Sequence, residues 1–193
     1  MFEVLLKTIG QKVLLSQHQQ EHCKTFFISK SIRKKQFLLQ QGSTCKYTAF
    51  VEKGVLRSYT IDEKGSEHIL QFAFEGWWIS DIYAFLTGEP SLLNIEAVED
   101  SELLLITHEG NEKMLSEIPE MERYFRKLTQ NAMIALQRRL IGSMSYSAEE
   151  KYTRLLDSFP EIFQKVPQHM IASYLGITPE TLSRIRKQIS MRK

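Results

Sequence analysis

The chain has 193 residues, of which 42% are hydrophobic and 25% are charged, and its formal net charge is +2 at pH 7. These values are those of an ordinary globular protein of one or two domains, long enough to bury a substantial core. Because the net charge is small, the molecule as a whole has no basic field that would indicate nucleic acid binding.

The two cysteines, Cys23 and Cys45, form no CxxC pair. The cysteines therefore give no support to a disulfide framework, a zinc finger or a four-cysteine iron–sulfur site. The first residues lack a basic run ahead of a long apolar core, and no apolar run approaches the ~20 residues that span a membrane. We therefore expect no signal peptide, no membrane partner and a cytoplasmic location.

Residues 1–30 are predicted to be helical from the spacing of their apolar residues. His18 and His22 stand four residues apart and could face one metal ion, with a solvated helix face as the alternative. Because no other ligand cluster supports them, we expect no metal and no cofactor. The apolar residues are Val4, Leu5, Ile9, Val13 and Leu14.

Residues 31–106 contain short apolar runs that turn signals separate, which is typical of an antiparallel sandwich, roll or barrel. The runs are 37–39, 48–51, 55–59, 68–72 and 103–106. The turn signals lie at 41–43, 52–54, 62–65 and 88–90.

The segment from Trp77 to Leu86 is unusually aromatic and predicts a strand that runs into a short helix. Its aromatic side chains could pack in the core, or they could form the wall of a small-molecule pocket. The candidate pocket residues are Trp78, Asp81, Tyr83, Phe85 and Leu92.

Residues 111–144 predict a long helix with two apolar stripes. One stripe would suffice for packing on a single sheet, so two stripes favour packing on the chain's own sheet and on a second subunit. The alternative is a helix buried wholly within one chain. Gly142-Ser143 is a candidate hinge. The first stripe is Met121, Phe125, Leu128, Ala132 and Ala135; the second is Met133, Leu136, Leu140 and Met144, with Ile134 and Ile141 beside it.

After a further helix at about 147–159, residues 166–187 read as two short helices joined by a tight turn. Gly176 can end the first helix in the left-handed conformation, and Thr178 can cap the second, with Pro179 at its first position. This pattern indicates a helix-turn-helix; the alternative is an ordinary helical hairpin. Apolar residues at 171, 175, 182 and 185 form its inner faces.

The end of the chain is basic, with no acidic residue after Glu180. Attached to a helix-turn-helix, such a segment is best interpreted as facing phosphates, although a solvated tail is the alternative. Its basic residues are Arg184, Arg186, Lys187, Arg192 and Lys193.

The order of these parts resembles the cyclic-AMP receptor / fumarate–nitrate regulator (Crp/Fnr) family of bacterial transcription factors. The resemblance rests on Ile171-Ala172, Leu175-Gly176, Thr178 and 180–184, and on the roll segments 51–57 and 62–65. It implies an α+β protein with an N-terminal antiparallel β-roll like the cyclic-nucleotide-binding jelly roll. The implied parts are a sensory roll over 1–110, a dimerisation helix over 111–144 and a helix-turn-helix domain over 145–193.

The resemblance places base readout on Glu180 and Arg184, since a carboxylate accepts from cytosine N4 and a guanidinium donates to guanine. Pro179 stands where the cyclic-AMP receptor has another arginine. The chain also ends before the β-hairpin wing of that branch. Gln168, His169, Thr178 and Thr181 fall on phosphate-contacting positions, with Ser183, Arg186 and Lys187 as further DNA-binding candidates.

The nucleotide pocket of the family uses a glycine–glutamate pair for ribose and an arginine–serine pair for phosphate. The matching positions here are Ser80-Asp81 and about Ser91-Leu92. A phosphate buried without its guanidinium lacks charge compensation. We therefore expect that cyclic AMP is not the effector.

We interpret the chain as a homodimeric DNA-binding transcriptional regulator of a pseudo-palindromic operator, and not as an enzyme. RNA polymerase and an unknown small-molecule effector are further candidate partners. One alternative is a ligand-binding or protein-interaction module that has lost DNA affinity. Another is a cupin-like metalloenzyme, which needs clustered metal ligands, whereas His68 and His108 stand alone in this region.

Overall fold

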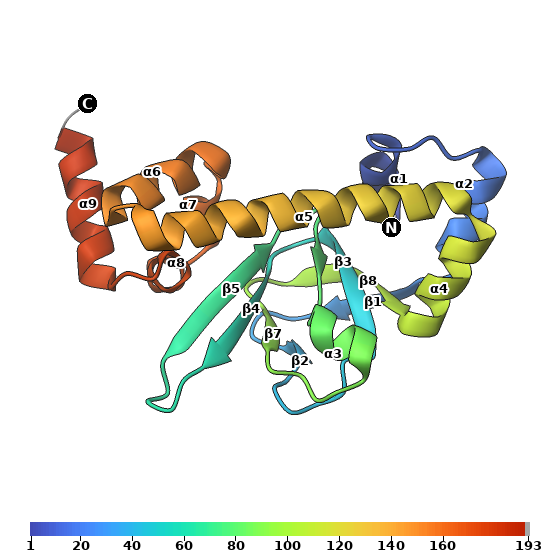
Figure 1. Ribbon diagram of the computed structural model, residues 1–193, viewed down its shortest axis with the longest axis horizontal. Coiled ribbons are helices and arrows are strands. Elements are labelled where there is room, and N and C mark those ends of the chain that lie inside the picture. Colours follow the sequence, from blue (N-terminus) through green and yellow to red (C-terminus); the bar gives the residue numbers. More distant parts are fainter. Residues whose placement is uncertain (192–193) are drawn as a thin grey trace. The chain divides into compact units, whose positions relative to one another are not determined.

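The computed structural model describes residues 1–191 and divides into two compact units (Figure 1). The first consists of Met1–Thr60 and Gln71–Gln130, and the second of Ile61–Leu70 and Asn131–Lys193. Arg192 and Lys193, part of the expected basic end, lie outside the described residues.

The first unit contains two four-stranded sheets, which confirm the predicted roll. The strands are β1 (Ile28–Ile32), β2 (Phe37–Leu39), β3 (Tyr47–Lys53), β4 (Leu56–Ile61), β5 (Glu67–Ala73), β6 (Trp78–Ile79), β7 (Asn94–Ala97) and β8 (Ser101–Thr107). One sheet has the strand order β1-β8-β3-β6 and the other β2-β7-β4-β5. All three pairs of the first sheet are antiparallel, as are β2–β7 and β4–β7 of the second. Strands β4 and β5 extend from this unit into the second.

Alternating side chains of the first sheet enter two separate cores. Ala49 and Val51 of β3, like Leu103 and Leu105 of β8, belong to the cluster between the sheets. Phe50, Leu104 and Ile106 point to the opposite face and join a cluster with the helices. Because both faces are covered, the run Leu103–Ile106 is apolar throughout rather than alternating.

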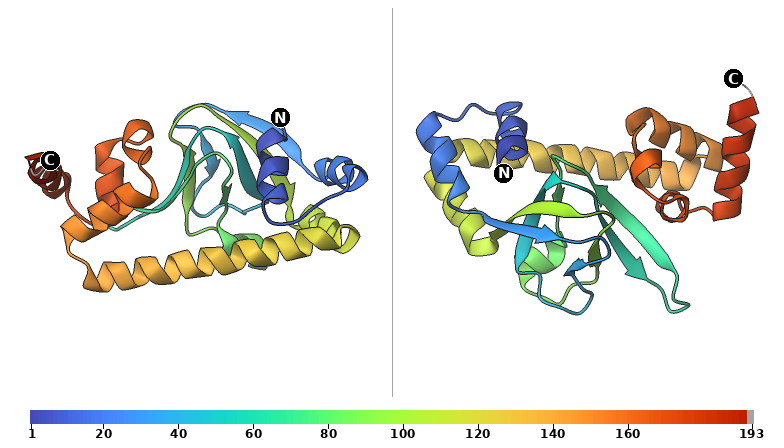
Figure 2. Two further views of the ribbon diagram at one scale, coloured as in Figure 1. Left: turned by 90° about the horizontal axis from the view of Figure 1, so that it is seen from above. Right: turned by 180° about the vertical axis from the view of Figure 1, so that it is seen from behind.

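Four helices of the first unit contribute to this second cluster (Figure 2). They are α1 (Glu3–Gly10), α2 (Gln17–Lys24), α4 (His108–Glu117) and the beginning of α5 (Pro119–Ser145). The prediction of one helical segment over 1–30 is wrong in two places. Ser16 caps a new helix with Gln19 in a capping box, and β1 begins at Ile28.

The helix predicted over 111–144 is likewise divided. Pro119 restricts the residue before it to extended backbone, and Ile118 has φ −128° and ψ 87°. The chain therefore ends α4 at Glu117 and starts α5 at Pro119.

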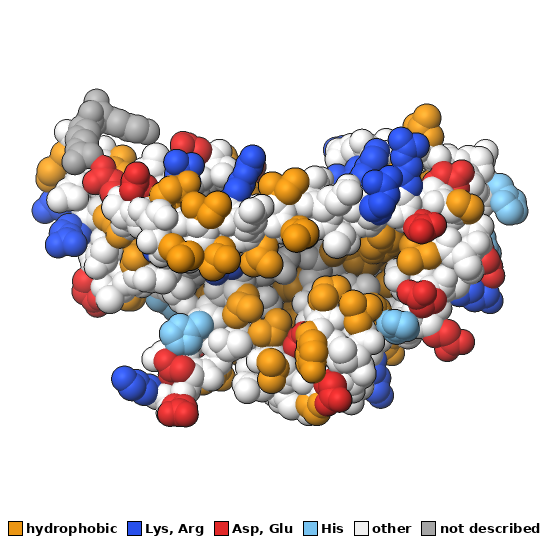
Figure 3. Space-filling model, in the orientation of Figure 1, with side chains coloured by type: hydrophobic (Ala, Val, Ile, Leu, Met, Phe, Trp, Pro, Cys, Tyr) orange, Lys and Arg blue, Asp and Glu red, His pale blue; other side chains and the backbone are white. Residues whose placement is uncertain are grey.

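The two apolar stripes of α5 have different surroundings. Met121 is buried in the helical cluster, and Phe125 and Leu128 pack against it. The large apolar residues of the second stripe and those beside it are 47% to 79% exposed. Figure 3 shows hydrophobic side chains along this part of α5.

The second unit contains the end of α5 and the helices α6 (Ala148–Ser158), α7 (Ile162–Lys165), α8 (Gln168–Leu175) and α9 (Pro179–Met191). Gly142 does not end α5, which continues to Ser145. A Cβ at Gly142 would lie 2.9 Å from Cδ2 of Tyr146. Close packing of Tyr146 thus gives this glycine a structural reason, and the hinge that the sequence suggested stays a prediction.

Candidate DNA interface

Helices α8 and α9 pack on each other and on α6, as a helix-turn-helix requires. Ile171, Ala172 and Leu175 of α8 are buried, as are Leu182 and Ile185 of α9. These are the inner faces that the sequence predicts.

The turn between the two helices is built by residues 176–178. Gly176 adopts the left-handed conformation with φ 67°, and Ile177 N donates to Ala172 O at 3.0 Å across it. This is the six-to-one bond of a Schellman motif, which glycine permits without strain. Thr178 Oγ1 then accepts from Thr181 N at 3.2 Å and caps α9.

The outer side of α9 gathers four of the predicted DNA-binding residues. Glu180, Ser183, Arg184 and Lys187 line one open surface together with Pro179. All four are exposed, and they lie on the side opposite to Leu182 and Ile185. A carboxylate, a hydroxyl and two cations on one helix face can donate to and accept from base edges and phosphates.

Glu180 is held in its charged form. Hydrogen bonding by its own backbone amide, and then by the Thr178 hydroxyl, lowers the pKa of the Glu180 carboxyl below its ordinary value. Like any glutamate, this side chain is ionised at neutral pH and is an acceptor only, which suits a partner that donates, such as cytosine N4.

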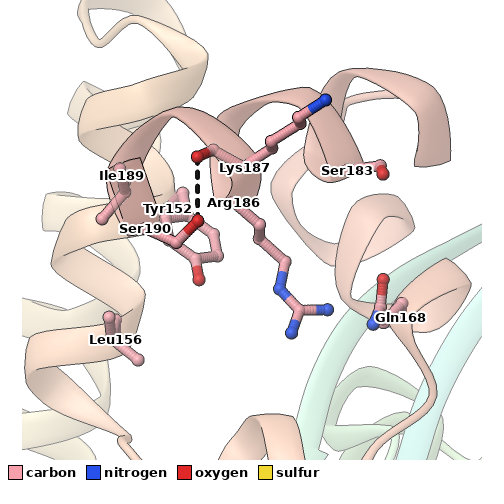
Figure 4. A pocket seen from close by; sticks show the side chains of 8 residues that line it. All are labelled: Tyr152, Leu156, Gln168, Ser183, Arg186, Lys187, Ile189 and Ser190. Carbon is pink, nitrogen blue, oxygen red and sulfur yellow. Dashed lines mark hydrogen bonds between the residues drawn. The ribbon is translucent and has the colours of Figure 1, made fainter. Parts of the chain in front are cut away.

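A cleft of about 560 Å³ lies beside this surface (Figure 4). Gln168, at the beginning of α8, lines this cleft together with Ser183, Arg186 and Lys187 of α9. The other residues that line it are Tyr152, Leu156, Ile189 and Ser190, which the sequence did not single out. In the sequence, the apolar residues among them have the spacing of ordinary core residues. Only the packing of α6 against α9 could show that they line a cleft.

Arg186 differs from the other basic residues of α9. Its side chain extends toward the start of α8, whereas Lys187 points away from it (Figure 4). The Arg186 guanidinium carbon lies 5.8 Å from the ring centroid of Phe163, and the residue is half-buried. The structure thus places Arg186 at the flank of the surface formed by Glu180, Ser183, Arg184 and Lys187.

The remaining phosphate-contact candidates lie at helix starts. Gln168 and His169 are exposed in the first turn of α8. Thr178 and Thr181 are engaged with each other, with their hydroxyl oxygens 3.2 Å apart. Amide groups at helix N-termini favour anions, so these positions suit a phosphate backbone.

The five candidate pocket residues of the roll are not gathered around one cavity. Trp78 belongs to the helical side, where its indole N–H donates to Tyr124 Oη at 3.0 Å. Phe85 is buried between the sheets, whereas Tyr83 and Leu92 are exposed. In this structure Phe85 is thus part of the core between the sheets, and Trp78 packs against the helical cluster.

Asp81, the remaining pocket candidate, is buried and engaged within the chain. Its carboxylate accepts from Ala84 N at 3.2 Å and so caps α3 (Ile82–Thr87). It also accepts from the Ser91 hydroxyl at 2.8 Å and from Leu92 N at 3.1 Å. The side chain that was expected to face a ligand thus faces its own backbone.

Among residues 1–191, no group of three or more His, Cys, Asp or Glu side chains is arranged to hold a metal ion. His22 instead lies 2.6 Å from the carboxylate of Glu117. No helix in the described part of the chain is long and apolar enough to cross a membrane.

Known proteins resemble both parts of the chain. Residues 29–117 match the cyclic nucleotide-binding domain family. The fumarate and nitrate reduction regulatory protein of Vibrio cholerae is 26% identical over 169 residues, which cover 81% of this chain and 66% of that protein. The regulatory protein HlyX of Actinobacillus pleuropneumoniae is 24% identical over 173 residues, covering 81% and 69% of the two chains.

Among solved structures, FixK2 from Bradyrhizobium japonicum has a TM-score of 0.73 at 20% identity, over 86% of this chain and 85% of FixK2. The chain spans about two thirds of the length of the two curated relatives. It has a cyclic nucleotide-binding domain fold followed by a helix-turn-helix, and in sequence and fold it resembles transcriptional regulators of the Crp/Fnr type.

Proposed function

We propose that this protein is a DNA-binding transcriptional regulator that recognises an operator through α9. The observation that carries the proposal is the exposed surface of Glu180, Ser183, Arg184 and Lys187 on one side of the helix. Helix α9 would enter the major groove, and the start of α8 would contact the phosphate backbone beside it. The names of the curated relatives describe regulatory proteins and support this function.

We propose further that the active form is a homodimer. Large apolar side chains from Met133 to Met144 leave a long apolar face exposed along α5. A second copy of the same helix would cover this face with side chains of matching chemistry. Two copies would present two recognition helices to a pseudo-palindromic operator with half-sites about one helical turn apart.

The protein would act by binding rather than by catalysis, in the cytoplasm. RNA polymerase would be a further partner of the DNA-bound protein. Any effector would differ from cyclic AMP. Asp81 stands where the family has its ribose-binding carboxylate, and hydrogen bonds from Ser91 and Leu92 already engage it.

Selection of bound genomic fragments with the full chain tests the proposal directly. We expect enrichment of one two-fold symmetric sequence, bound as a dimer, with an affinity that falls steeply as salt is raised from about 50 to about 200 mM (about 10³-fold or more for roughly six phosphate interactions). Failure to enrich any common sequence would favour the alternative, an interaction module without DNA affinity.

A further inference from the structure

The hydroxyl of Ser173 in α8 forms hydrogen bonds with a strand that lies far away in the sequence, and not with its own helix. Other helical hydroxyls of the second unit bond carbonyls of their own helices: Ser143 to Leu140 O, and Thr153 to Glu149 O. Such local bonds are the ordinary behaviour of serine and threonine in helices. Ser173 Oγ instead donates to Glu67 O at 2.6 Å and accepts from Ile69 N at 3.1 Å.

These two backbone groups belong to β5, which is one of the two edge strands of its sheet. The outward N–H and C=O groups of an edge strand need partners, which a neighbouring strand normally supplies. The single hydroxyl of Ser173 serves both residue 67 and residue 69, because a hydroxyl can donate and accept at once. In this way α8 of the helix-turn-helix provides hydrogen bonds of the kind that a neighbouring strand would provide.

A second side chain strengthens the same junction. Arg139 of α5 donates through Nη2 to Ile69 O at 3.0 Å and to Tyr174 O at 3.4 Å, and through Nη1 to Leu70 O. Its guanidinium carbon also lies 4.3 Å from the ring centroid of Tyr174. The guanidinium therefore joins α5, β5 and α8 within the second unit, which its planar set of donors makes possible.

We propose that the hairpin of residues 61–70 braces the helix-turn-helix, with Ser173 and Arg139 as positioning residues for DNA binding. The inference rests on the proposed function, since α8 carries Gln168 and His169 at its start. The brace holds α8, and with it α9, in one orientation before DNA arrives.

The test replaces Ser173 in the full-length protein and reads two quantities. Ser173→Ala removes both hydrogen bonds, so exchange of the Ile69 amide with deuterium should become about three- to tenfold faster. Operator affinity should fall about three- to tenfold through the freedom that α8 gains, equally for matched and mismatched operators. Ser173→Thr retains the hydroxyl and should restore both quantities.

Thr153→Ala is the matched control, because the Thr153 hydroxyl donates to a carbonyl of its own helix. It should change neither quantity. Arg139→Lys retains the charge without the planar fork and should weaken operator binding in the same direction as Ser173→Ala. Thermal unfolding of each variant identifies any that fail to fold.

Unchanged exchange at Ile69 in Ser173→Ala would overturn the brace, whatever happens to DNA binding. Faster exchange with unchanged or tighter operator binding would also overturn it, because the interaction would then be neutral or inhibitory. If the wild-type chain binds no operator, the proposed function fails, and the exchange experiment alone still decides whether these hydrogen bonds exist.

Discussion

Asp81 and Ser91 are joined by a buried hydrogen bond of 2.8 Å in the first unit. Through its other hydrogen bonds the same carboxylate caps α3 and accepts from Leu92 N. A short helix and the segment that follows it are thus tied to one anionic side chain. The residue that the family resemblance assigns to a ligand position has a structural task here.

Replacing this carboxylate should destabilise the roll. Asp81→Ala removes a helix cap and a charged acceptor for one buried and one partly buried donor, at a cost of about 2–3 kcal/mol in the free energy of unfolding. Denaturant unfolding measures it. Glu89→Ala, at an exposed carboxylate close by in the sequence, is the control and should stay within about 0.5 kcal/mol of wild type. Equal effects of the two variants would contradict the assigned role.

Gly142 offers a test of close packing against hinge flexibility. Alanine is favoured over glycine inside a helix by about 1 kcal/mol, but overpacking costs about 1–3 kcal/mol. Since Arg154 lies 4.2 Å from the Tyr146 ring centroid and restrains that ring, we expect Gly142→Ala to destabilise the protein. In a Tyr146→Ala background the same change should stabilise it. Denaturant unfolding of the wild type, the two single variants and the double variant gives both values, and stabilisation in the wild-type background would favour the hinge interpretation.

The sequence predicts best where periodicity and punctuation agree. The run Leu103–Ile106 and the turn at Gly176 are both recognisable, because each depends on local chemistry. Strand β1, with sequence ISKSI, is not recognisable, because four of its five residues are exposed and its pairing with β8 is long-range. Pro119 signals the break at Ile118, yet the helical pattern on both sides conceals it.

The candidate DNA surface is predictable because its residues share one helix, where spacing determines the face. The pocket residues are not, since Trp78 and Phe85 lie on opposite sides of one sheet and only the fold separates them. Ser173 carries no sequence signal at all. Its partners lie 104 and 106 residues away, and no local pattern encodes such a distance.

The exposed stripe of α5 predicts a dimer that a single charge can break. Leu136 is 67% exposed in the chain, so Leu136→Glu should fold normally and place a carboxylate in the helix seam. Burial of that charge is unfavourable by several kcal/mol, which shifts a micromolar dimer to monomer. Light scattering measures the mass. Leu14→Glu, at a position that is 87% exposed outside this stripe, should remain dimeric.

A monomeric wild type at micromolar concentration would contradict the seam. Leu128 is less suitable for this test, because it packs against the helical cluster of the first unit. A charge there would disturb folding and association together.

Glu180 and Lys187 should contribute differently to DNA binding. Glu180→Ala should relax the preference at one base pair per half-site by about 1–3 kcal/mol. Lys187→Ala should weaken all sequences about equally and flatten the salt slope by roughly one unit for each phosphate interaction removed. Titrations of matched and mismatched operators at two salt concentrations separate the two. An even decrease over all sequences for Glu180→Ala would show that its role is wrongly assigned.

Arg186 and the pH dependence of Glu180 allow two further measurements on the same surface. Arg186 lies at the flank, near Phe163, so Arg186→Ala should change the salt slope less than Lys187→Ala.

The lowered pKa of Glu180 keeps its carboxylate ionised as the pH falls below neutrality. The base preference that depends on it should therefore be the same at about pH 7 and about pH 5.5, since even an ordinary glutamate has its pKa near ~4.3. A change of preference over this range would contradict the acceptor role.

Cyclic AMP should neither bind tightly nor control the protein. No arginine stands at 91 or 92, and the donors there, the Ser91 hydroxyl and Leu92 N, already serve Asp81. A nucleotide phosphate would have to displace a buried carboxylate and would meet its negative charge. The missing charge-assisted pair costs on the order of 3–5 kcal/mol, or roughly two to four decades in affinity. Calorimetry with cyclic AMP and cyclic GMP should detect no binding in the low micromolar range, and operator affinity should be the same with and without either nucleotide. Low-micromolar binding coupled to operator affinity would contradict the internal role of Asp81 and assign the roll to cyclic-nucleotide sensing.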